Sequence, residues 1–483
     1  MAELKNCTTN FYSELCGVNV IIDPRSQLGV DDDRLLLIGQ KGPLGSAADG
    51  SIEQVRDDNR VALFGQDSML NKMIDEARQQ FPTVELYAFV APVAGTAAVS
   101  DVTFAGVAAA TGPGLLYLFV NGRPYQVAFD PATDTDTTVA AKFATLINAQ
   151  NNTLGATSAA GVLTITTDFI GRIAGFLDVR ESYGVRPDLS SSASVTVTVA
   201  TTAATGFADL SALAASSQGF EFVAMPYTDD AAVTDLSTYL CAQWSGGVNS
   251  RAFGVFYGTD TQAIVRAQAT NNALISFAAI RGALTPSYLE TVSYAGIMFR
   301  RLNCQSTDIA ASLTGERMPA MLAPEIADRY TPAQEAALIE AGMGYFRVTR
   351  VNDVNIGRAV TTYTVADNGT LDQSLRDVNR PSMIACISRF FRENLTAKYT
   401  GYAFRRDGIV GRGSERVATV AAIRNYMITL ASRLSDRNLL QDVDGFISSL
   451  SVEFDAETGC IAIKADPELV TQFCCATITL RTI

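Results

Sequence analysis

The chain has 483 residues, a hydrophobic fraction of 48 %, a charged fraction of 18 % and a formal net charge of −13. This length exceeds what one core serves, so we expect about three domains. The negative charge disfavours general nucleic-acid binding, because phosphate contact needs clustered lysine and arginine. Apolar runs stay below the ~18 residues that span a bilayer, and Met1 to Asn10 lack the apolar core of a secretion signal. We therefore expect a protein kept in a cytoplasm, or released without a standard signal, with no membrane insertion.

Groups that commonly carry catalysis are scarce. Histidine is absent, which removes Ser-His-Asp and Cys-His catalysis and the usual general base near neutral pH. Glycines at 408–413 have the wrong spacing to cradle phosphate and are interpreted as a flexible loop. The acidic run Asp31 to Asp33 and the pair Asp57 and Asp58 lie in polar connections, so solvated turns are favoured over catalytic carboxylate pairs. We expect no enzyme activity, no cofactor and no metal.

The cysteines follow no CxxC spacing and no regular interval. They are Cys7, Cys16, Cys241, Cys304, Cys386, Cys460, Cys474 and Cys475. Cys474 and Cys475 are adjacent and would point to opposite faces of a strand. Small buried thiols are therefore expected in place of a disulfide or metal framework.

A strand that could separate from the core of its own subunit is predicted near each end of the chain. Val18 to Ile22 alternate before Pro24, and Ala476 to Ile483 alternate up to the last residue. The apolar residues on one face are Val18, Val20 and Ile22 in the first segment and Ala476, Ile478 and Leu480 in the second. An isolated strand must find donors and acceptors for its backbone. We therefore expect these segments to pair with other subunits.

The apolar run Leu35 to Ile38 fits a strand that is buried on both faces. A helix is predicted from Met69, because apolar residues recur at helical spacing after the hydroxyl cap Ser68 and stop before Pro82. Val84 to Val90 predict a second strand. The order strand, helix, strand is typical of an α/β core.

From about residue 95 to 205 the sequence is rich in alanine, threonine, glycine and serine and poor in charge. A hairpin is predicted at Leu115 to Val120 and Tyr125 to Phe129, with a turn at Asn121 and Gly122 that the next two residues lengthen. A helix is predicted from the spacing of Val139, Phe143, Leu146 and Ile147. Further strands are predicted where apolar residues alternate with threonines, at Leu163 and Ile165 and at Val195, Val197 and Val199. Low complexity is the competing interpretation, but alternating β-branched residues favour a folded α+β insertion.

The α/β pattern resumes at Phe220 to Met225. The further predicted elements are helices at Asp229 to Leu240, Gln262 to Ala273 and Tyr288 to Arg301 and strands at Phe253 to Tyr257, Phe346 to Val351 and Arg358 to Val365. Thr331 to Gln334 form a capping-box helix start, and Gly342 ends that helix. Trp244 is interpreted as a packing residue rather than a ligand platform.

Beyond Pro381, two amphipathic helices and a hairpin are predicted. The apolar positions are Ile384, Ile387, Phe391 and Leu395 in the first helix and Val417, Val420, Ile423, Met427, Leu430 and Leu434 in the second. The hairpin joins Leu450 to Phe454 and Cys460 to Ala465. Its apolar residues, expected to receive exchanged strands, are Val452, Phe454, Ile461 and Ile463.

Arginines gather around these helices, and acidic residues follow downstream. The arginines are Arg389, Arg392, Arg405, Arg406, Arg412, Arg416, Arg424, Arg433 and Arg437, and the acids are Asp442, Asp444, Glu453, Asp455, Glu457, Asp466 and Glu468. They form either solvated faces or complementary charges toward a stacked copy or a partner. The candidates for such contacts are Arg405, Arg406, Arg412, Arg416, Asp442 and Asp444.

The predicted fold is a multidomain α/β and α+β structure. It has a mixed-sheet core, an inserted β-rich domain and a C-terminal helix-plus-hairpin domain that carries exchanged terminal strands. The predicted bounds are an N-terminal arm at 1–30, a discontinuous core at 31–94 and 206–380, the insertion at 95–205, an inner C-terminal domain at 381–470 and a strand arm at 471–483.

The order of segments resembles the contractile tail sheath family of Mu-like bacteriophages. The matching motifs are LLLIGQKGPLGSAADG (Leu35 to Gly50), FGQDSMLNKMIDEARQQFPTVELYAFVAP (Phe64 to Pro92), FAGVAAATGPGLLYLFVNGRPYQVAF (Phe104 to Phe129), VAAKFATLINA (Val139 to Ala149), FEFVAMPYTD (Phe220 to Asp229), RMPAMLAPEIADRYTPAQEAALIEAG (Arg317 to Gly342) and GRAVTTYT (Gly357 to Thr364). They extend over nearly the whole chain, and the region from Arg389 matches less well.

This resemblance implies hexameric rings stacked helically around a tail tube, with terminal arms exchanged between neighbours. It also implies contraction triggered by a baseplate, which drives the tube through the host envelope. The implied partners are further copies of the chain and the tube, baseplate and tail terminator proteins. The implied location is the virion, after assembly in the host cytoplasm. The alternatives are the sheath of a headless contractile injection particle or, in another class, an envelope- or polysaccharide-binding module that uses the β-rich insertion.

Overall fold

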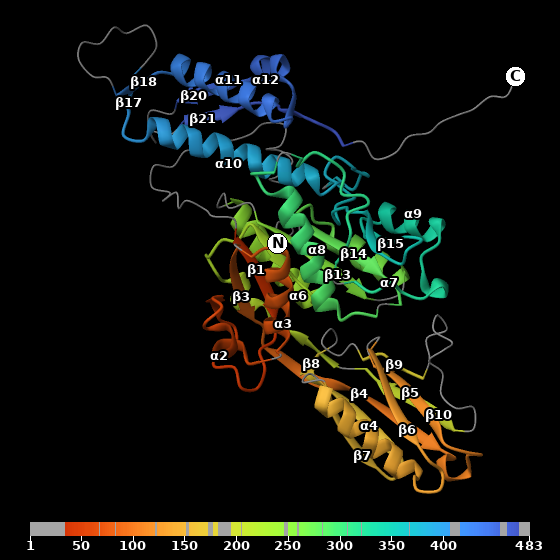
Figure 1. The fold of residues 1–483 in the computed structure, drawn as a ribbon. Coiled ribbons are helices and arrows are strands. Elements are labelled where there is room, and N and C mark those ends of the chain that lie inside the picture. The colour runs from red at the N-terminus through yellow and green to blue at the C-terminus, as the bar shows by residue number, and fades with distance from the viewer. Residues whose placement is uncertain are drawn as a thin grey trace, which may run out of the picture.

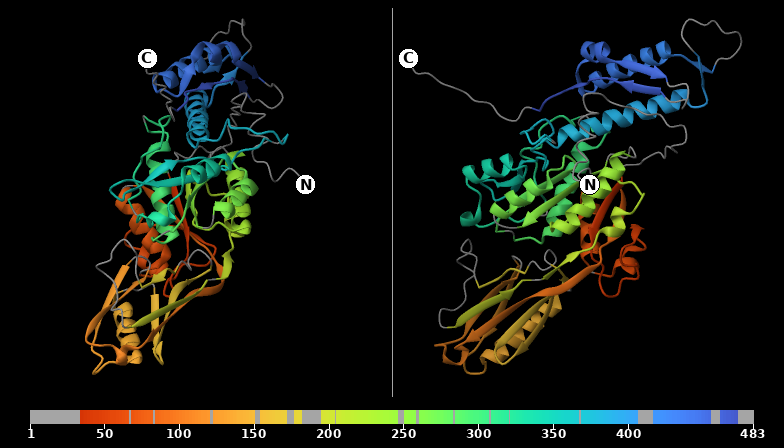
Figure 2. Two further views of the ribbon diagram at one scale, coloured as in Figure 1. Left: turned by 90° about the vertical axis from the view of Figure 1, so that its right-hand side faces the viewer. Right: turned by 180° about the vertical axis from the view of Figure 1, so that it is seen from behind.

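The structure of the protein, a computed structural model, describes residues 34–472 apart from 67, 83, 121–122, 151–153, 172–176, 182–194, 204, 246–249, 258–259, 283, 307, 320, 367, 406–415 and 455–460. The molecule is elongated (Figures 1 and 2). A helix-covered sheet occupies its middle. A β-rich unit forms one end, and helices with short strands form the other. The fold is thus a mixed α/β structure with several sheets.

The central sheet has eight strands in the order β16-β15-β14-β13-β12-β1-β3-β2. These are β1 (Arg34–Gly39), β2 (Ile52–Gln54), β3 (Glu85–Val90), β12 (Phe222–Ala224), β13 (Arg251–Tyr257), β14 (Ile275–Ile280), β15 (Gly344–Val348) and β16 (Val354–Arg358). The strands from β15 to β3 run parallel, and β2 and β16 are antiparallel edges. Leu35 to Ile38 are fully buried in β1, as the continuous apolar run predicts.

Helices cover both faces of this sheet. They are α2 (Arg60–Phe64), α3 (Met69–Gln80), α5 (Ser211–Ala214), α6 (Asp230–Ser245), α7 (Asp260–Thr270), α8 (Ser287–Leu302) and α9 (Pro332–Glu340), with the short 3-10 turn η3 (Ile326–Asp328). Leu35 and Leu37 pack with residues of α3 and α8, whereas Leu36 and Ile38 pack with residues of α6, α7 and α9. Alternate residues of one strand therefore serve two cores.

Two predicted helix starts are confirmed. Ser68 accepts a hydrogen bond from the Asn71 amide at 3.1 Å at the start of α3. Thr331 and Gln334 form a reciprocal capping box with Pro332 in the first turn of α9. After α9, Gly342 takes a φ of +81°, a left-handed conformation that favours glycine.

The β-rich unit is inserted between β3 and β12. It contains β4 (Val93–Ala105), η2 (Val107–Ala109), β5 (Gly114–Val120), β6 (Arg123–Phe129), α4 (Asp136–Gln150), β7 (Leu154–Ala159), β8 (Val162–Ile170), β9 (Val179–Arg180), β10 (Thr196–Thr202) and β11 (Thr205–Ala208). One sheet runs β10-β4-β8-β7, with β11 also paired to β4, and a second runs β6-β5-β9. The predicted lengthening of the β5–β6 turn is wrong, because Arg123 and Pro124 pair with Val120 and Phe119 in the ladder.

The β-rich unit is attached to the core in two ways. β4 begins at Val93, shortly after β3 ends at Val90, and it pairs with β11 on the return path. Gln40 at the end of β1 also holds Ile170 of β8. Its side-chain amide donates to the Ile170 carbonyl at 2.7 Å and accepts from the Ile170 amide at 3.2 Å. The buried Gln40 side chain thus satisfies both backbone groups of Ile170, as a neighbouring strand would.

The C-terminal part contains α10 (Asn379–Tyr399), β17 (Ala403–Phe404), β18 (Val417–Ala418), α11 (Val420–Asp436), β19 (Leu440–Asp442), α12 (Val443–Ser449), β20 (Ser451–Phe454), β21 (Ile461–Lys464) and β22 (Glu468–Leu469). The predicted stripe of α10, Ile384, Ile387, Phe391 and Leu395, is buried. The stripe of α11 begins at Val420 instead of Val417, because Thr419 caps the helix by accepting from the Ala422 amide. Pro381 lies inside α10 and does not precede it.

The predicted strand Arg358 to Val365 is wrong. β16 occupies Val354–Arg358 and ends where that strand was expected to begin. The following residues are extended but bond to scattered partners, because the Thr361 amide donates to the Arg376 carbonyl and the Thr362 amide to the Ile275 carbonyl. The β-branched pattern therefore marked a buried extended segment that does not form a ladder.

Candidate functional site

The predicted exchange strands, Val18 to Ile22 and Ala476 to Ile483, lie outside the described residues, as do Asp31 to Asp33, Arg406 and Arg412. Their roles stay predictions. Asp57 and Asp58 are described and lie exposed in a turn before α2.

The predicted receiving hairpin is confirmed as a hairpin. β20 and β21 pair antiparallel, with Val452 opposite Ile463 and Phe454 opposite Ile461. Ile463 is buried, and the Phe454 ring stacks on Phe404 of β17 with centroids 3.6 Å apart. Within the described part of the chain this sheet has two strands. A two-stranded sheet offers an outer row of backbone groups on each side, so the hairpin can accept further strands.

The described charge candidates lie in or beside the strands and helices of the C-terminal part. The backbone of Arg405 and of Arg416 takes part in the β17–β18 pairing. Asp442 caps α12 by accepting from the Gly445 amide at 2.9 Å, and Asp444 lies in the first turn of that helix. An acid there is favoured by the helix dipole. Contacts from these residues to a tube or a neighbour stay predictions.

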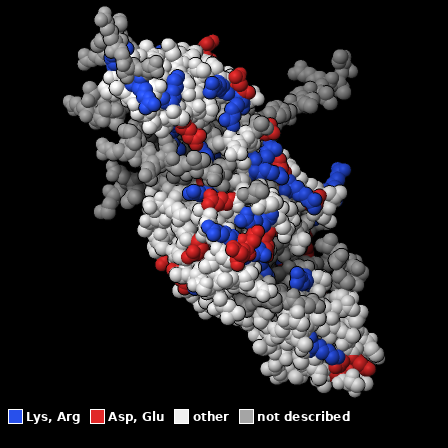
Figure 3. Space-filling model, turned by 60° about the vertical axis from the view of Figure 1, so that its left-hand side comes forward, with Lys and Arg blue, Asp and Glu red and all other residues white. Residues whose placement is uncertain are grey.

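Charged side chains are unevenly spread over the face in Figure 3. They gather over the core and the C-terminal part, and few lie on the β-rich unit at the lower end. From the sequence, the arginines of this region could form either solvated faces or contacts with a partner. Several of them instead bind groups within the chain. Arg424 donates to the Leu450 carbonyl at 2.7 Å and to the Ile447 carbonyl at 3.0 Å, which ties α11 to the hairpin region.

A disulfide joins the core to the C-terminal part. Cys304, just after α8, is bonded to Cys386 in α10, with Cα atoms 5.1 Å apart. Cys241 is disulfide-bonded as well. The expectation of buried free thiols is therefore wrong for these residues. Cys304 and Cys386 are 82 residues apart, and only the packing of α10 across the end of α8 brings them together.

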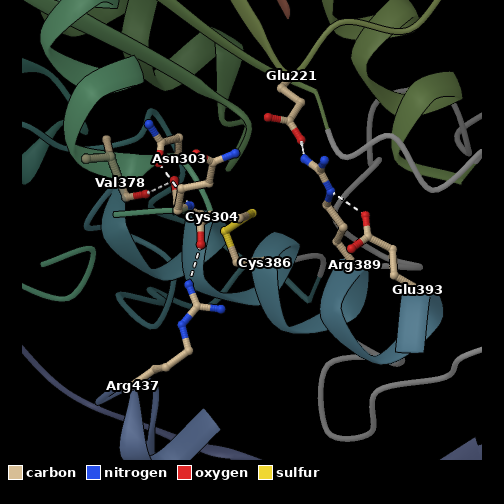
Figure 4. The surroundings of a disulfide bond; sticks show 10 residues. Glu221, Asn303, Cys304, Val378, Cys386, Arg389, Glu393 and Arg437 are labelled. Atoms are coloured by element: carbon tan, nitrogen blue, oxygen red, sulfur yellow. Dashed lines mark hydrogen bonds and ion pairs between the residues drawn. A yellow bond between two sulfur atoms is a disulfide. The ribbon is translucent and has the colours of Figure 1, made fainter. Parts of the chain in front are cut away.

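The same junction contains a buried ion pair. Arg389 of α10 bonds to Glu221, the residue before β12, and its Nε donates to Glu393 at 2.7 Å (Figure 4). The Arg389 side chain is 16 % exposed and that of Glu221 is 7 % exposed. Arg437 donates to the Cys304 carbonyl. Breaking a buried pair by removing one partner costs ~3–5 kcal/mol, so this junction holds α10 firmly on the core.

A cavity lies between the core and the β-rich unit, at the carboxyl ends of β12 and β13. Its volume is about 1020 Å³, and its lining includes Tyr227, Asp229 and Asp230. Asp230 pairs with Arg266, and burial raises the pKa of Asp229. The acids at the N-termini of α6 and α7 offset the positive helix ends, which disfavours anion binding.

Glu290 of α8 is fully buried, and sequence reasoning gave no signal for it. The Tyr257 hydroxyl lies within hydrogen-bond distance of both the Glu290 carboxyl and the Thr285 carbonyl. A single hydroxyl proton cannot serve both acceptors, so a protonated Glu290 completes the set. Burial agrees with this, because it raises the pKa of Glu290 well above its ordinary value.

Similarity to a curated protein extends along nearly the whole chain. The Mu-like prophage FluMu tail sheath protein of Haemophilus influenzae is 25 % identical over 473 residues, which cover 96 % of this chain and 94 % of that protein. The resemblance to the tail sheath family of Mu-like phages is thus confirmed. No family model matches the chain.

Solved structures to which this chain is similar include two sheath tail proteins and a contracted helical sheath. The sheath tail protein of Desulfitobacterium hafniense is 14 % identical with a TM-score of 0.49, and the alignment covers 93 % of this chain and 96 % of that one. The sheath tail protein of Listeria innocua is 12 % identical with a TM-score of 0.46 and 96 % coverage of each chain. The contracted helical sheath of the anti-feeding prophage is 10 % identical with a TM-score of 0.47, covering 95 % and 96 %.

Across the described residues, no group of three or more cysteine, aspartate or glutamate side chains is placed to hold a metal ion. None of the described helices combines the length and the apolarity needed to cross a membrane.

Proposed function

We propose that this chain is the structural subunit of a contractile bacteriophage tail sheath, which polymerises as stacked hexameric rings around a tail tube. Contraction of this polymer drives the tube through the host envelope. The tube, baseplate and tail terminator proteins are its partners, and the chain makes no direct contact with nucleic acid. One observation carries the proposal: the similarity to a tail sheath protein spans 96 % of the chain, and so includes the core, the insertion and the C-terminal part.

In this proposal neighbouring subunits are joined by strand exchange. Val18 to Ile22 of one copy and Ala476 to Ile483 of another pair with the β20–β21 hairpin of a third. The two-stranded hairpin supports this, because both of its outer edges can take a strand. Each main-chain hydrogen bond contributes only ~0.5–1.5 kcal/mol net, so cohesion comes from many repeated contacts. The proposed domains are those predicted from the sequence, with the region 381–470 facing the tube.

Contraction in this proposal needs no nucleotide. A polymer with two packed arrangements moves toward the one with the lower free energy once a trigger removes the barrier between them. The core stays intact within each subunit, since the junction with α10 is fixed by a disulfide and a buried ion pair. The exchanged strands then serve as the links that bend between subunits.

The test is electron microscopy of the purified chain in negative stain. The full chain is expected to form straight hollow cylinders, and a soluble monomer at all concentrations would overturn the sheath proposal. Deleting Thr477 to Ile483 is expected to abolish the cylinders. If that deletion still polymerised into full-length sheaths, strand exchange would be wrong.

A pair of matched variants separates pairing from mere loss of residues. Ile478→Asp with Leu480→Asp places charge on the predicted apolar row and is expected to block assembly. Thr477→Asp with Thr479→Asp places the same charge on the other face of the segment and is expected to be far milder. Equal effects of the two double variants would contradict the predicted facing of this strand.

A further inference from the structure

β10 is a long strand with an open side. Its seven residues, Thr196–Thr202, pair with β4 from Ala105 to Val99. Among the described residues no strand lies on its other side, and no described backbone group outside β4 bonds to the β10 backbone. A full row of donors and acceptors therefore faces outward.

Two other sheet edges, β7 and β16, are blocked by groups of the chain itself. On β7, the Asn148 side chain donates to the Ala156 carbonyl and accepts from the Ala156 amide, both at 2.8 Å. On β16, the Gly315 amide donates to the Ile356 carbonyl, and the Met318 amide donates to the Val354 carbonyl, both at 2.8 Å. The chain thus closes the edges of β7 and β16 with its own groups, whereas among the described residues β10 has no such cover.

The side chains of β10 do not protect it either. The strand, TVTVATT, contains no charge and no proline, which are the usual means of blocking an edge. Val197 and Val199 turn toward the core of the unit, and Thr196, Thr198 and Ala200 are exposed on the opposite face. On the neighbouring strand β4, the Asp101 carboxylate accepts a hydrogen bond from the Thr164 hydroxyl at 2.6 Å.

Charge indicates which partner fits this edge. The chain has a net charge of −13, so two copies repel each other wherever acids accumulate. β10 itself carries no charged residue. A second copy can therefore approach β10 without placing like charges together, and in a polymer of this chain its local concentration is far above that of any other protein.

We propose that β10 receives an extended strand from a second copy of this chain. This contact between β-rich units adds to the strand exchange at the β20–β21 hairpin, and it presupposes the polymer proposed above. The strand that enters extends the sheet beyond β10 by main-chain hydrogen bonds. The alternation of threonine and valine on β10 sets which face of the entering strand turns inward.

Two threonine-to-lysine variants test the contact. Thr198→Lys puts a charge on the open edge, and Thr157→Lys is its matched control. Thr157 is an equally exposed threonine on the same face of the sheet, but it lies on β7, whose edge Asn148 closes. We expect Thr198→Lys to raise the concentration needed for polymerisation at least tenfold, and Thr157→Lys to change it less than twofold, both by sedimentation.

Hydrogen exchange of the wild-type chain gives a second, independent measurement. Amides of residues 196–202 are expected to exchange at least tenfold more slowly in polymers than in dilute unassembled chain, whereas those of 154–159 keep the same rate. Polymers without protection at 196–202, or equal effects of the two lysines, would overturn the β10 contact and leave the sheath proposal standing. A wild-type chain that never polymerises would overturn both.

Discussion

Removing the Cys304–Cys386 disulfide should destabilise the junction between the core and α10. Replacing both residues by serine opens a covalent loop of 82 residues in the unfolded chain. The chain-entropy relation gives a loss of about 4.5 kcal/mol for a loop of that length at 25 °C. This value is an upper figure, because the reduced unfolded chain retains some structure.

Trp244 supplies the assay. This residue, the only tryptophan of the chain, packs against a small cluster that contains Leu375 and Ile384. Because Ile384 belongs to α10, the fluorescence of Trp244 reports on the packing of α10 against the core. Urea unfolding of the unassembled chain should show a lower midpoint for the double-serine variant, by roughly 1.5 to 4.5 M at m-values of ~1–3 kcal/mol/M. Measurements with and without reductant give the internal control, since reduced wild type also lacks the bond.

Two results would refute this reasoning. Equal midpoints for wild type and variant under oxidising conditions would show that the bond adds nothing to the junction. A gap that persists in reductant would show that the serine side chains, and not the lost bond, cause the change. The expected pattern is a difference in urea midpoint that disappears when reductant is added. Reduction at Cys241 affects both proteins equally, because both contain this residue.

Three further outcomes are expected. Arg389→Met removes the ion pair of Arg389 with the buried Glu221 carboxylate and should cost ~3–5 kcal/mol in chemical unfolding. The exposed Arg433→Met should stay within ~0.5 kcal/mol, and equal losses would contradict the buried pair. The raised pKa of Glu290 means that its stabilising contribution is complete below about pH 4.5 and is lost as pH rises through the folded-state pKa; Glu290→Gln should flatten that loss in thermal scans across pH, unlike the exposed Glu453→Gln, and an unchanged pH profile would refute the assignment. Asp442→Ala removes the cap of α12 and should lower stability by ~1 kcal/mol, and a smaller effect than that of Asp444→Ala in the same melting experiment would contradict the capping role.

Local signals predicted much of the fold. Thr331 and Gln334 marked a helix start because the capping box is formed by neighbours in the sequence. The run Leu35 to Ile38 marked a central strand because burial on both faces removes the polar alternation. The C-terminal hairpin was predicted from two alternating segments with a turn between them, and the structure has it at β20 and β21.

The remainder depends on contacts between distant segments. The Cys304–Cys386 bond and the pair of Arg389 with Glu221 have no local signature, because their partners are far apart in sequence. Glu290 resembles any polar residue of a helix until Tyr257 is placed beside it. The exchange of terminal strands stays a prediction, since those segments lie outside the described residues.

The way in which the β-rich unit leaves the core has a mechanical consequence. β4 and β11 run side by side as its stem, paired from Val93 with Ala208 to Thr96 with Thr205. Both strands are anchored at the same end, close to β3 and the segment before β12. A pull on the unit therefore loads the two strands lengthwise and in parallel, so their hydrogen bonds are not peeled one at a time. Tension on the outer end of the molecule is carried directly to the central sheet, where β3, β1 and β12 lie adjacent.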